Sequence, residues 1–328
     1  MTYLENSKQY TGSDLENIFF RPMLTGESAQ DLGVRVLYNM PQPTHVQLWD
    51  GQRNILQKFT SAGWAGGKAA TKYEKTVNLN RVKAELGFSA ANYFSMVYEK
   101  VSSLVNTHMD DLSGTELEQA ETALFKQALA ENIRVTMWIG DTSAASGYNT
   151  FDGLLKRING LVDDDGVYNF SYQAAALEDP AYAVELFDKL WAGADPRIPG
   201  LKADDRLAYF VSSDIYRLYE KYLDAKGADA AYADAMNGRR TLAYHGIPVV
   251  DVRLGSYLGA TSFRQSFVML TDRRNLVLAV NTADMPGNEV RMWYNPDEME
   301  NRQRAVFMAG TQILDEALIS FAYLSLIH

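Results

Sequence analysis

The sequence has no cysteine among its 328 residues, which excludes disulfides, thiolate metal sites, iron–sulfur clusters and cysteine nucleophiles. It has only four histidines, His45, His108, His245 and His328, and they lie far apart in the chain. No HExxH motif and no pair of histidines at helical spacing occurs. We therefore expect no metal site built from cysteine or histidine, and no bound cofactor.

Long apolar runs are also missing. No stretch approaches the roughly 18–20 residues that a membrane-spanning helix needs. The first ten residues, MTYLENSKQY, contain neither a basic start nor an apolar core of the kind found in secretory signals. The sequence therefore predicts a soluble protein made in a cytosol, with no membrane partner.

An excess of positive charge is the third absence. Lys and Arg together number 31 against 41 for Asp and Glu, which gives a net charge of -10. Because a dedicated duplex-binding protein needs clustered cations for phosphate contacts, this class is disfavoured. Apolar residues make up 47% of the chain, which is enough for a buried core of one large or two ordinary domains.

The first part of the chain predicts extended structure. Residues 1–43 show no sustained helical period and end in two prolines, Pro41 and Pro43. They fit either an extended arm that reaches over other subunits or an ordinary first strand with loops.

Residues 44–85 predict a long β-hairpin. The residues at 45–49 favour a β-strand. Through 71–82 apolar and polar residues alternate imperfectly, which predicts the strand that pairs with it. The flexible tip contains Gly63, Trp64, Gly66, Gly67 and Lys68. These residues miss the GxxxxGK[ST] spacing of a phosphate-binding loop. Because polar side chains line both flanks, the hairpin fits a domain edge or a contact with another subunit.

Residues 113–139 give the clearest helical pattern. Ser113 and Glu116 match a capping box, and the apolar residues that follow fall on one stripe. A helix of this length spans roughly 37 Å, which suits a strut rather than a compact domain. Gly140 is placed to end it. Residues 180–262 then show a mixed α/β pattern, and the C-terminal stretch is strongly β.

No group of residues in the sequence has the composition and spacing of a known catalytic or metal site. The aspartates at 163–165 are consecutive, whereas calcium loops alternate their carboxylates and close with Glu. The serines at 212–213 precede a helical segment and predict helix caps rather than a nucleophile. Arg239 and Arg240 fit salt bridges between subunits at least as well as a ligand clamp.

Several stretches, in this order and spacing, resemble the tailed-phage major capsid proteins of the fold named after phage Hong Kong 97. They are the helix end with Gly140-Asp141 and then 151–155 (FDGLL), the strand 244–250 (YHGIPVV), and the terminal strands 272–279, 290–294 and 304–310. Each motif is weak alone, whereas their order and spacing are specific and cover nearly the whole chain.

The resemblance implies an α+β fold with an N-terminal arm, an extended hairpin (E-loop), a long spine helix, a P-domain sheet and an α/β A-domain. The expected ranges are arm 1–43, E-loop 44–85, P-domain 86–152 with spine helix 113–139, A-domain 153–285, and P-domain return strands 286–328.

The resemblance also implies a structural role without enzymatic activity. The subunit would assemble with itself into hexamers and pentamers of an icosahedral head that encloses double-stranded DNA, contacted non-specifically at the lumen. The portal and a separate scaffolding protein would be partners, because the short region before the hairpin leaves no room for a long scaffolding segment; a decoration protein is a further candidate. The product would form the virion shell after assembly in the host bacterial cytoplasm. The assembly residues would be Gly63, Trp64, Gly66, Gly67, Lys68, Arg239 and Arg240.

Two alternatives stay open at this point. An encapsulin, the shell of a cellular nanocompartment, resembles the same fold but usually has a shorter N-terminal region. A cytosolic α/β enzyme with an acidic loop site at 163–165 belongs to a different class. Such an enzyme would stop at a small closed oligomer, whereas a shell protein would reach megadalton mass.

The hairpin interpretation predicts the effect of one deletion. Removal of residues 61–69 should leave a soluble, folded subunit that fails to close shells, because the tip would contact neighbours rather than its own core. Circular dichroism and electron microscopy check the two halves of this expectation. Closed shells at normal yield would show that the tip is not an assembly element.

Overall fold

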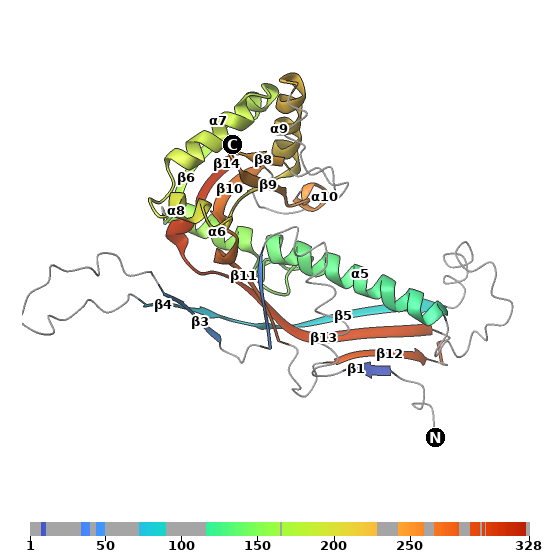
Figure 1. The fold of residues 1–328 in the computed structure, drawn as a ribbon. Helices are drawn as coiled ribbons and strands as arrows, with labels where there is room; N and C mark the ends of the chain where they lie inside the picture. The colour runs from blue at the N-terminus through green and yellow to red at the C-terminus, as the bar shows by residue number, and fades with distance from the viewer. Residues whose placement is uncertain are drawn as a thin grey trace, which may run out of the picture.

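The computed structural model describes residues 8–10, 34–39, 44–49, 72–89, 116–164, 166–227, 242–258, 266–281, 289–295, 297–298 and 300–325. These residues form two six-stranded sheets, one two-stranded hairpin and a set of helices (Figure 1). None of the helices in these ranges is long and apolar enough to cross a membrane. Of the expected arm, only 8–10 and 34–39 are described, and both contain strands of the first sheet.

The first sheet is organised around one long strand, β13. Its strands are β1 (Lys8–Tyr10), β2 (Arg35–Tyr38), β5 (Asn80–Ser89), β11 (Leu276–Asn281), β12 (Glu289–Asn295) and β13 (Glu300–Ile313). On one side β13 pairs with β5, and on the other it pairs first with β12 and then with β11, always antiparallel. β1 extends the sheet beyond β12, and β2 runs parallel to β11.

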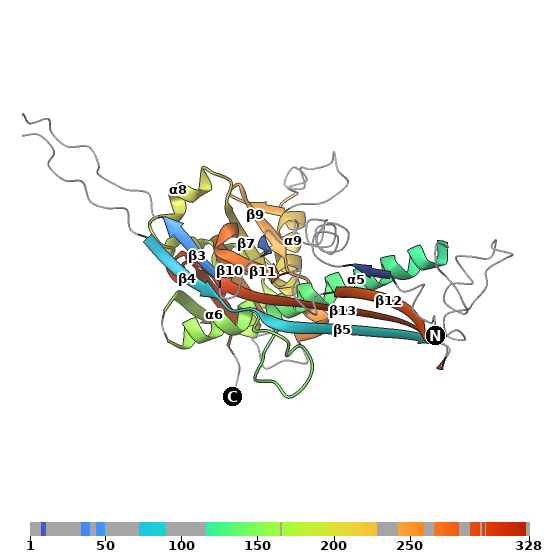
Figure 2. The ribbon, with the colours of Figure 1, turned by 90° about the horizontal axis from the view of Figure 1, so that it is seen from below.

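Helix α5 (Glu116–Ile139) covers one face of this sheet (Figures 1 and 2). The sheet residues on that face are apolar and buried, as the period of two requires: Val290, Met292, Ala305, Phe307 and Ala309. From the helix, the ridge at four-residue spacing faces them: Phe125, Leu129, Ile133 and Met137. The predicted strut is therefore a sheet-packed helix, and it ends at the residue before Gly140 as the sequence indicated.

The second sheet has the order β6–β14–β10–β7–β9–β8. Its strands are β6 (Tyr168–Tyr172), β7 (Leu207–Val211), β8 (Leu242–Tyr244), β9 (Ile247–Asp251), β10 (Phe267–Asp272) and β14 (Ser320–Leu324). Every residue of β7 and β10 is buried, because both faces of the sheet are covered. Helices α7 (Tyr182–Ala192) and α9 (Ser213–Ala225) cover one face, and α5 with α6 (Leu154–Asp163) covers the other.

Short helices complete the chain. They are η2 (Ala174–Glu178), α8 (Ile198–Lys202), α10 (Gly255–Leu258), η4 (Arg273–Asn275) and η5 (Glu316–Leu318).

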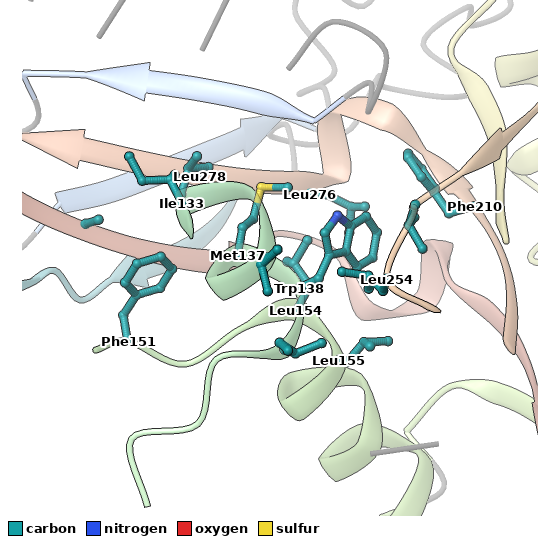
Figure 3. Packing of buried hydrophobic residues seen from close by; sticks show 14 of the residues in the cluster. Ile133, Met137, Trp138, Phe151, Leu154, Leu155, Phe210, Leu254, Leu276 and Leu278 are labelled. Carbon is teal, nitrogen blue, oxygen red and sulfur yellow. The ribbon is translucent and has the colours of Figure 1, made fainter. Parts of the chain in front are cut away.

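The last turns of α5 pack against both sheets at once. Trp138 is fully buried, and its ring centroid lies 5.7 Å from that of Phe210 in β7. On the neighbouring ridge, Ile133 lies beside Leu278 of β11 (Figure 3). The C-terminal end of α5 therefore forms the core that joins the two sheets.

Two glycines allow the chain to turn at this crowded point. The Gly153 N–H donates to the Gly140 carbonyl at 2.8 Å, so the two backbones run in contact. A Cβ at Gly140 would lie 2.1 Å from the Phe151 carbonyl oxygen, and one at Gly153 would lie 2.6 Å from the Trp138 carbonyl oxygen. The Gly-Asp and Phe-Asp-Gly motifs are thus explained by close backbone approach.

The chain passes between the sheets in places that differ from the expected domain ranges. β11 lies within 153–285 but belongs to the first sheet, and β14 lies within 286–328 but belongs to the second. β5 begins at Asn80, inside the expected hairpin range 44–85, and also belongs to the first sheet. The two sheets are therefore interleaved along the chain.

Alanine at either joint glycine should destabilise the protein. We expect Gly140→Ala and Gly153→Ala each to lower the free energy of unfolding by about 2–3 kcal/mol, because backbone atoms occupy the space of the new methyl group. Gly160→Ala is the matched control. This exposed position in α6 has no atom within 4 Å of a built Cβ, so alanine should raise stability by up to about 1 kcal/mol. Urea unfolding of the three variants measures this, and equal effects at all three positions would contradict it.

Candidate assembly site

The base of the predicted hairpin is described, and it is anchored to the first sheet. β3 (Thr44–Trp49) pairs antiparallel with β4 (Lys72–Val77). Val46, Val77 and Leu79 pack with apolar residues of β11 and the end of β13 in a cluster of their own. This cluster lies on the face opposite α5, since Val277 and Ala279 alternate with the α5-facing residues of β11. The hairpin therefore starts from a base that is packed on the first sheet.

Polar contacts fix the direction in which the hairpin leaves the sheet. A Cβ at Gly310 of β13 would lie 2.2 Å from the Asn78 carbonyl oxygen, so the two backbones touch there. Nearby, the Gln312 side-chain amide donates to the Thr76 carbonyl at 2.8 Å. The Lys75 ammonium pairs with a Glu316 carboxylate oxygen of η5 at 2.5 Å. We call these contacts, with the apolar cluster above, the hairpin root.

Arg157 connects α6 to the hairpin root. Its Nε donates to the Thr311 hydroxyl at 3.3 Å, and its Nη1 donates to the Gln312 side-chain oxygen at 3.4 Å. Burial lowers the pKa of Arg157, while the negative charge of Asp152 opposes this shift. One side of Gln312 thus receives hydrogen bonds from α6 while its other side donates to the hairpin.

A lysine between two carboxylates holds the loop that follows α5. The Lys156 ammonium lies 2.7 Å from the Asp141 carboxylate and 2.6 Å from that of Asp152. Hydrogen bonds from Lys156 and Ser143 lower the pKa of Asp141 to about 2. Burial opposes the same effect at Asp152, but bonds from Lys156 and Thr142 outweigh it and lower the pKa of that carboxyl too. The two ends of loop 141–152 are therefore tied together beside the joint glycines.

A second polar contact ties α5 to the second sheet. The Arg134 guanidinium donates to the Val252 carbonyl at 2.7 Å, just after β9. Glu131 accepts from Arg134 at 2.9 Å and from the Tyr257 hydroxyl at 3.0 Å. The hydrogen bond from Arg134 is the main cause that lowers the pKa of Glu131. The position of α5 is thus set by directional bonds as well as by Trp138.

Along β12 and the first half of β13, the face of the first sheet away from α5 is charged. Glu289 accepts from Arg304 at 2.7 Å and from Arg291 at 3.1 Å. The Arg304 guanidinium also lies 5.8 Å from the centroid of the Trp293 ring. The face away from α5 is therefore apolar where the hairpin root covers β11, and ion-paired along β12 and the first half of β13.

We compared the chain with known proteins, by sequence and by structure. The sequence matches no family model and no curated protein. The structure is similar to a chain of the satellite phage P4 procapsid, which includes the size determination (Sid) protein, with TM-score 0.57 and 10% identity. That match covers 94% of this chain and 98% of the other. The capsid of Myoviridae phage XM1 matches with TM-score 0.50 and 11% identity, over 92% of each chain. The chain has a phage capsid fold.

The capsid fold confirms the α+β architecture expected from the sequence. The predicted assembly residues lie outside the described residues: Gly63, Trp64, Gly66, Gly67, Lys68, Arg239 and Arg240. The contacts at the hairpin root were missed, although an isolated glycine in a strand, here Gly310, often marks a close backbone approach.

The described aspartates at 163–164 and serines at 212–213 lie at helix ends. Asp163 and Asp164 are exposed at the end of α6, and Asp165 lies outside the described residues. Ser212 is the N-cap residue of α9, but the predicted capping role of its hydroxyl is wrong. That hydroxyl instead donates to the Phe267 carbonyl and accepts from the Phe267 N–H at the start of β10. Within the described ranges, no three His, Asp or Glu side chains gather as a metal site would need.

Acid should weaken the loop clamp in a defined range of pH. Because the folded-state pKa of Asp141 lies near 2, below its ordinary 3.8, the clamp contributes stability above pH 3.8 and loses it as the pH falls towards 2. We expect Asp141→Asn to be less stable than the parent at about pH 5, with the difference shrinking by about pH 2.5. Chemical unfolding at several pH values measures the difference.

Asp164→Asn is the control for this experiment, since it removes an exposed carboxylate that lies outside the clamp. The difference in unfolding free energy between Asp164→Asn and the parent should not show the same dependence on pH. A difference for Asp141→Asn that stays constant with pH would contradict the assigned role of Lys156.

Proposed function

We propose that this chain is the major capsid subunit of a tailed phage, a structural protein that builds an icosahedral head. The observation that carries the proposal is the capsid fold over 94% of the chain. The subunit would assemble with itself into hexamers and pentamers and enclose double-stranded DNA. It would act without catalysis, as part of the virion, after assembly in the host bacterial cytoplasm.

The shape of the subunit supports this role. α5 and the first sheet extend together away from the second sheet and its helices (Figures 1 and 2). A shell subunit must bury surface against several neighbours, and stable interfaces of this kind run to roughly 2,000–5,000 Å². An elongated body exposes more edge for such contacts than a compact one of equal mass.

In this proposal each expected domain corresponds to a part of the structure. The E-loop, expected within 44–85, would reach neighbouring subunits in the direction set by the hairpin root. The arm 1–43 would do so beyond β1 and β2, which pair within the first sheet. The first sheet with α5 would be the P-domain, and the second sheet with its helices the A-domain. The assembly contacts would include Gly63, Trp64, Gly66, Gly67, Lys68, Arg239 and Arg240.

The net charge of -10 fits a shell that contains DNA without binding it tightly. DNA at the lumen would be contacted non-specifically. The portal and a separate scaffolding protein would be partners during assembly, and a decoration protein is a candidate on the outside.

Electron microscopy with light-scattering mass on the same sample tests the proposal. We expect closed round or icosahedral particles of megadalton mass, either from the purified protein or after addition of a crowding agent. A uniform dimer or tetramer that persists on concentration would contradict it and favour an enzyme. Closed particles that enclose a protein cargo rather than DNA would support an encapsulin instead.

A further inference from the structure

Strand β5 leaves one edge of the first sheet open along the described chain. All ten of its residues pair with β13, from Asn80 opposite Ala309 to Ser89 opposite Glu300. No described strand pairs with its other edge, and Figure 1 and Figure 2 both place β5 at the margin of the sheet. A long strand edge with unpaired backbone groups is a template for a further strand.

The side chains of β5 make this edge unusual for one that stays solvated. Leu86 is 37% exposed, although it shares the α5-facing side of the strand with the buried Val82. On the opposite side, Lys83 and Glu85 are exposed and pair with each other at 2.8 Å. A pair so exposed contributes little to the stability of a lone chain. The strand thus presents the exposed Leu86 on its apolar side and an exposed ion pair on its charged side.

We propose that β5 pairs antiparallel with β5 of a second copy, about a two-fold axis at Ala84. In this register residue numbers opposite each other sum to 168. Ala84 faces itself, Lys83 faces Glu85 of the other copy, and Val82 faces Leu86. Within 82–86 each charge meets its opposite and each apolar residue meets another, and the symmetry makes the Lys83–Glu85 and Val82–Leu86 pairs twice.

In neighbouring registers, opposite charges and apolar residues no longer face each other. A two-fold axis at Lys83 would set two lysines against each other, and one at Glu85 would set two glutamates together. A shift by one residue would place the charged side of one copy on the apolar side of the other. The sequence of β5 is therefore self-complementary in one register centred on this stretch.

The pairing goes beyond the proposed function, because two copies satisfy it whether or not a shell closes. It would join two first sheets into one continuous sheet and give the subunit a contact with two-fold symmetry. Inside a shell, many such contacts act together, so each can be weak and reversible during assembly.

The absence of native cysteine allows a direct test by disulfide trapping on the full chain. In the proposed register the two Cα atoms at position 84 lie about 4.5–5.5 Å apart, inside the range that a disulfide spans. Ala84→Cys, oxidised with diamide, should therefore give a covalent dimer on a non-reducing gel.

Two single-cysteine controls frame this result. Lys83→Cys lies next to the axis but faces a different residue of the partner, and Ser143→Cys is an exposed loop position away from β5. Both should cross-link about tenfold more slowly than Ala84→Cys. Equal rates at the three positions, or a faster rate at Lys83→Cys, would overturn the proposed register.

Charge reversal separates a contact between copies from the ion pair within one strand. On the Ala84→Cys background, Lys83→Glu alone and Glu85→Lys alone should each cut cross-linking about tenfold, because like charges then face each other. A mixture of these two variants should recover a mixed dimer, since every facing pair is again opposite in sign. Within each strand the charges stay alike, so recovery can only come from the partner. No mixed dimer, judged by mass spectrometry, would overturn the proposal.

Microscopy of the same samples distinguishes this inference from the proposed function. Shells that form at normal yield without cross-links at position 84 would overturn the β5 pairing and leave the capsid role intact. Cross-linked dimers that never grow into particles would support the pairing and contradict the capsid role.

Discussion

The fold depends on the burial of the last turns of α5 between two sheets. Trp138 packs on β7 of the second sheet, while Ile133 and Met137 pack on the first. Burying an aromatic side chain and its aliphatic neighbours contributes several kcal/mol, about 1.5–3 for each large side chain. Because one rigid helix carries both contacts, the two sheets are held in a fixed relation. The joint glycines and the Lys156 clamp then determine where the chain goes next.

Local sequence patterns predict much of this fold. The helix predicted at 113–139 is confirmed over its described part as α5. The mixed α/β pattern predicted over 180–262 is confirmed by α7, α9, β7 and β9. α6 was overlooked although Leu154, Leu155, Ile158 and Val162 lie on one face. Segments that pair with distant strands are predicted less well. β6 pairs in parallel with β14, and β13 runs from 300 to 313 rather than over the expected 304–310. Its polar start is a strand because β5 and β12 flank it.

In the candidate assembly site too, local features could be predicted and long-range contacts could not. The sequence located the hairpin from its alternation and its glycine-rich tip. Its root could not be predicted, because the hydrogen bond from Gln312 to Thr76 joins residues 236 positions apart. The sequence around Gln312 or Thr76 does not indicate that the two residues will meet. A physical criterion for such sites is the isolated glycine in a long strand, which marks where another backbone must cross.

The interleaving of the sheets has a consequence for synthesis. β14 lies between β6 and β10, and it is built from residues 320–324 of 328. The second sheet is therefore complete only after residues 320–324 have left the ribosome, long after β6 at 168–172. Until then β6 lacks the strand that it pairs with, and the edge of β10 that β14 covers stays open. A chain cut short before residue 320 would therefore expose two strand edges to other chains.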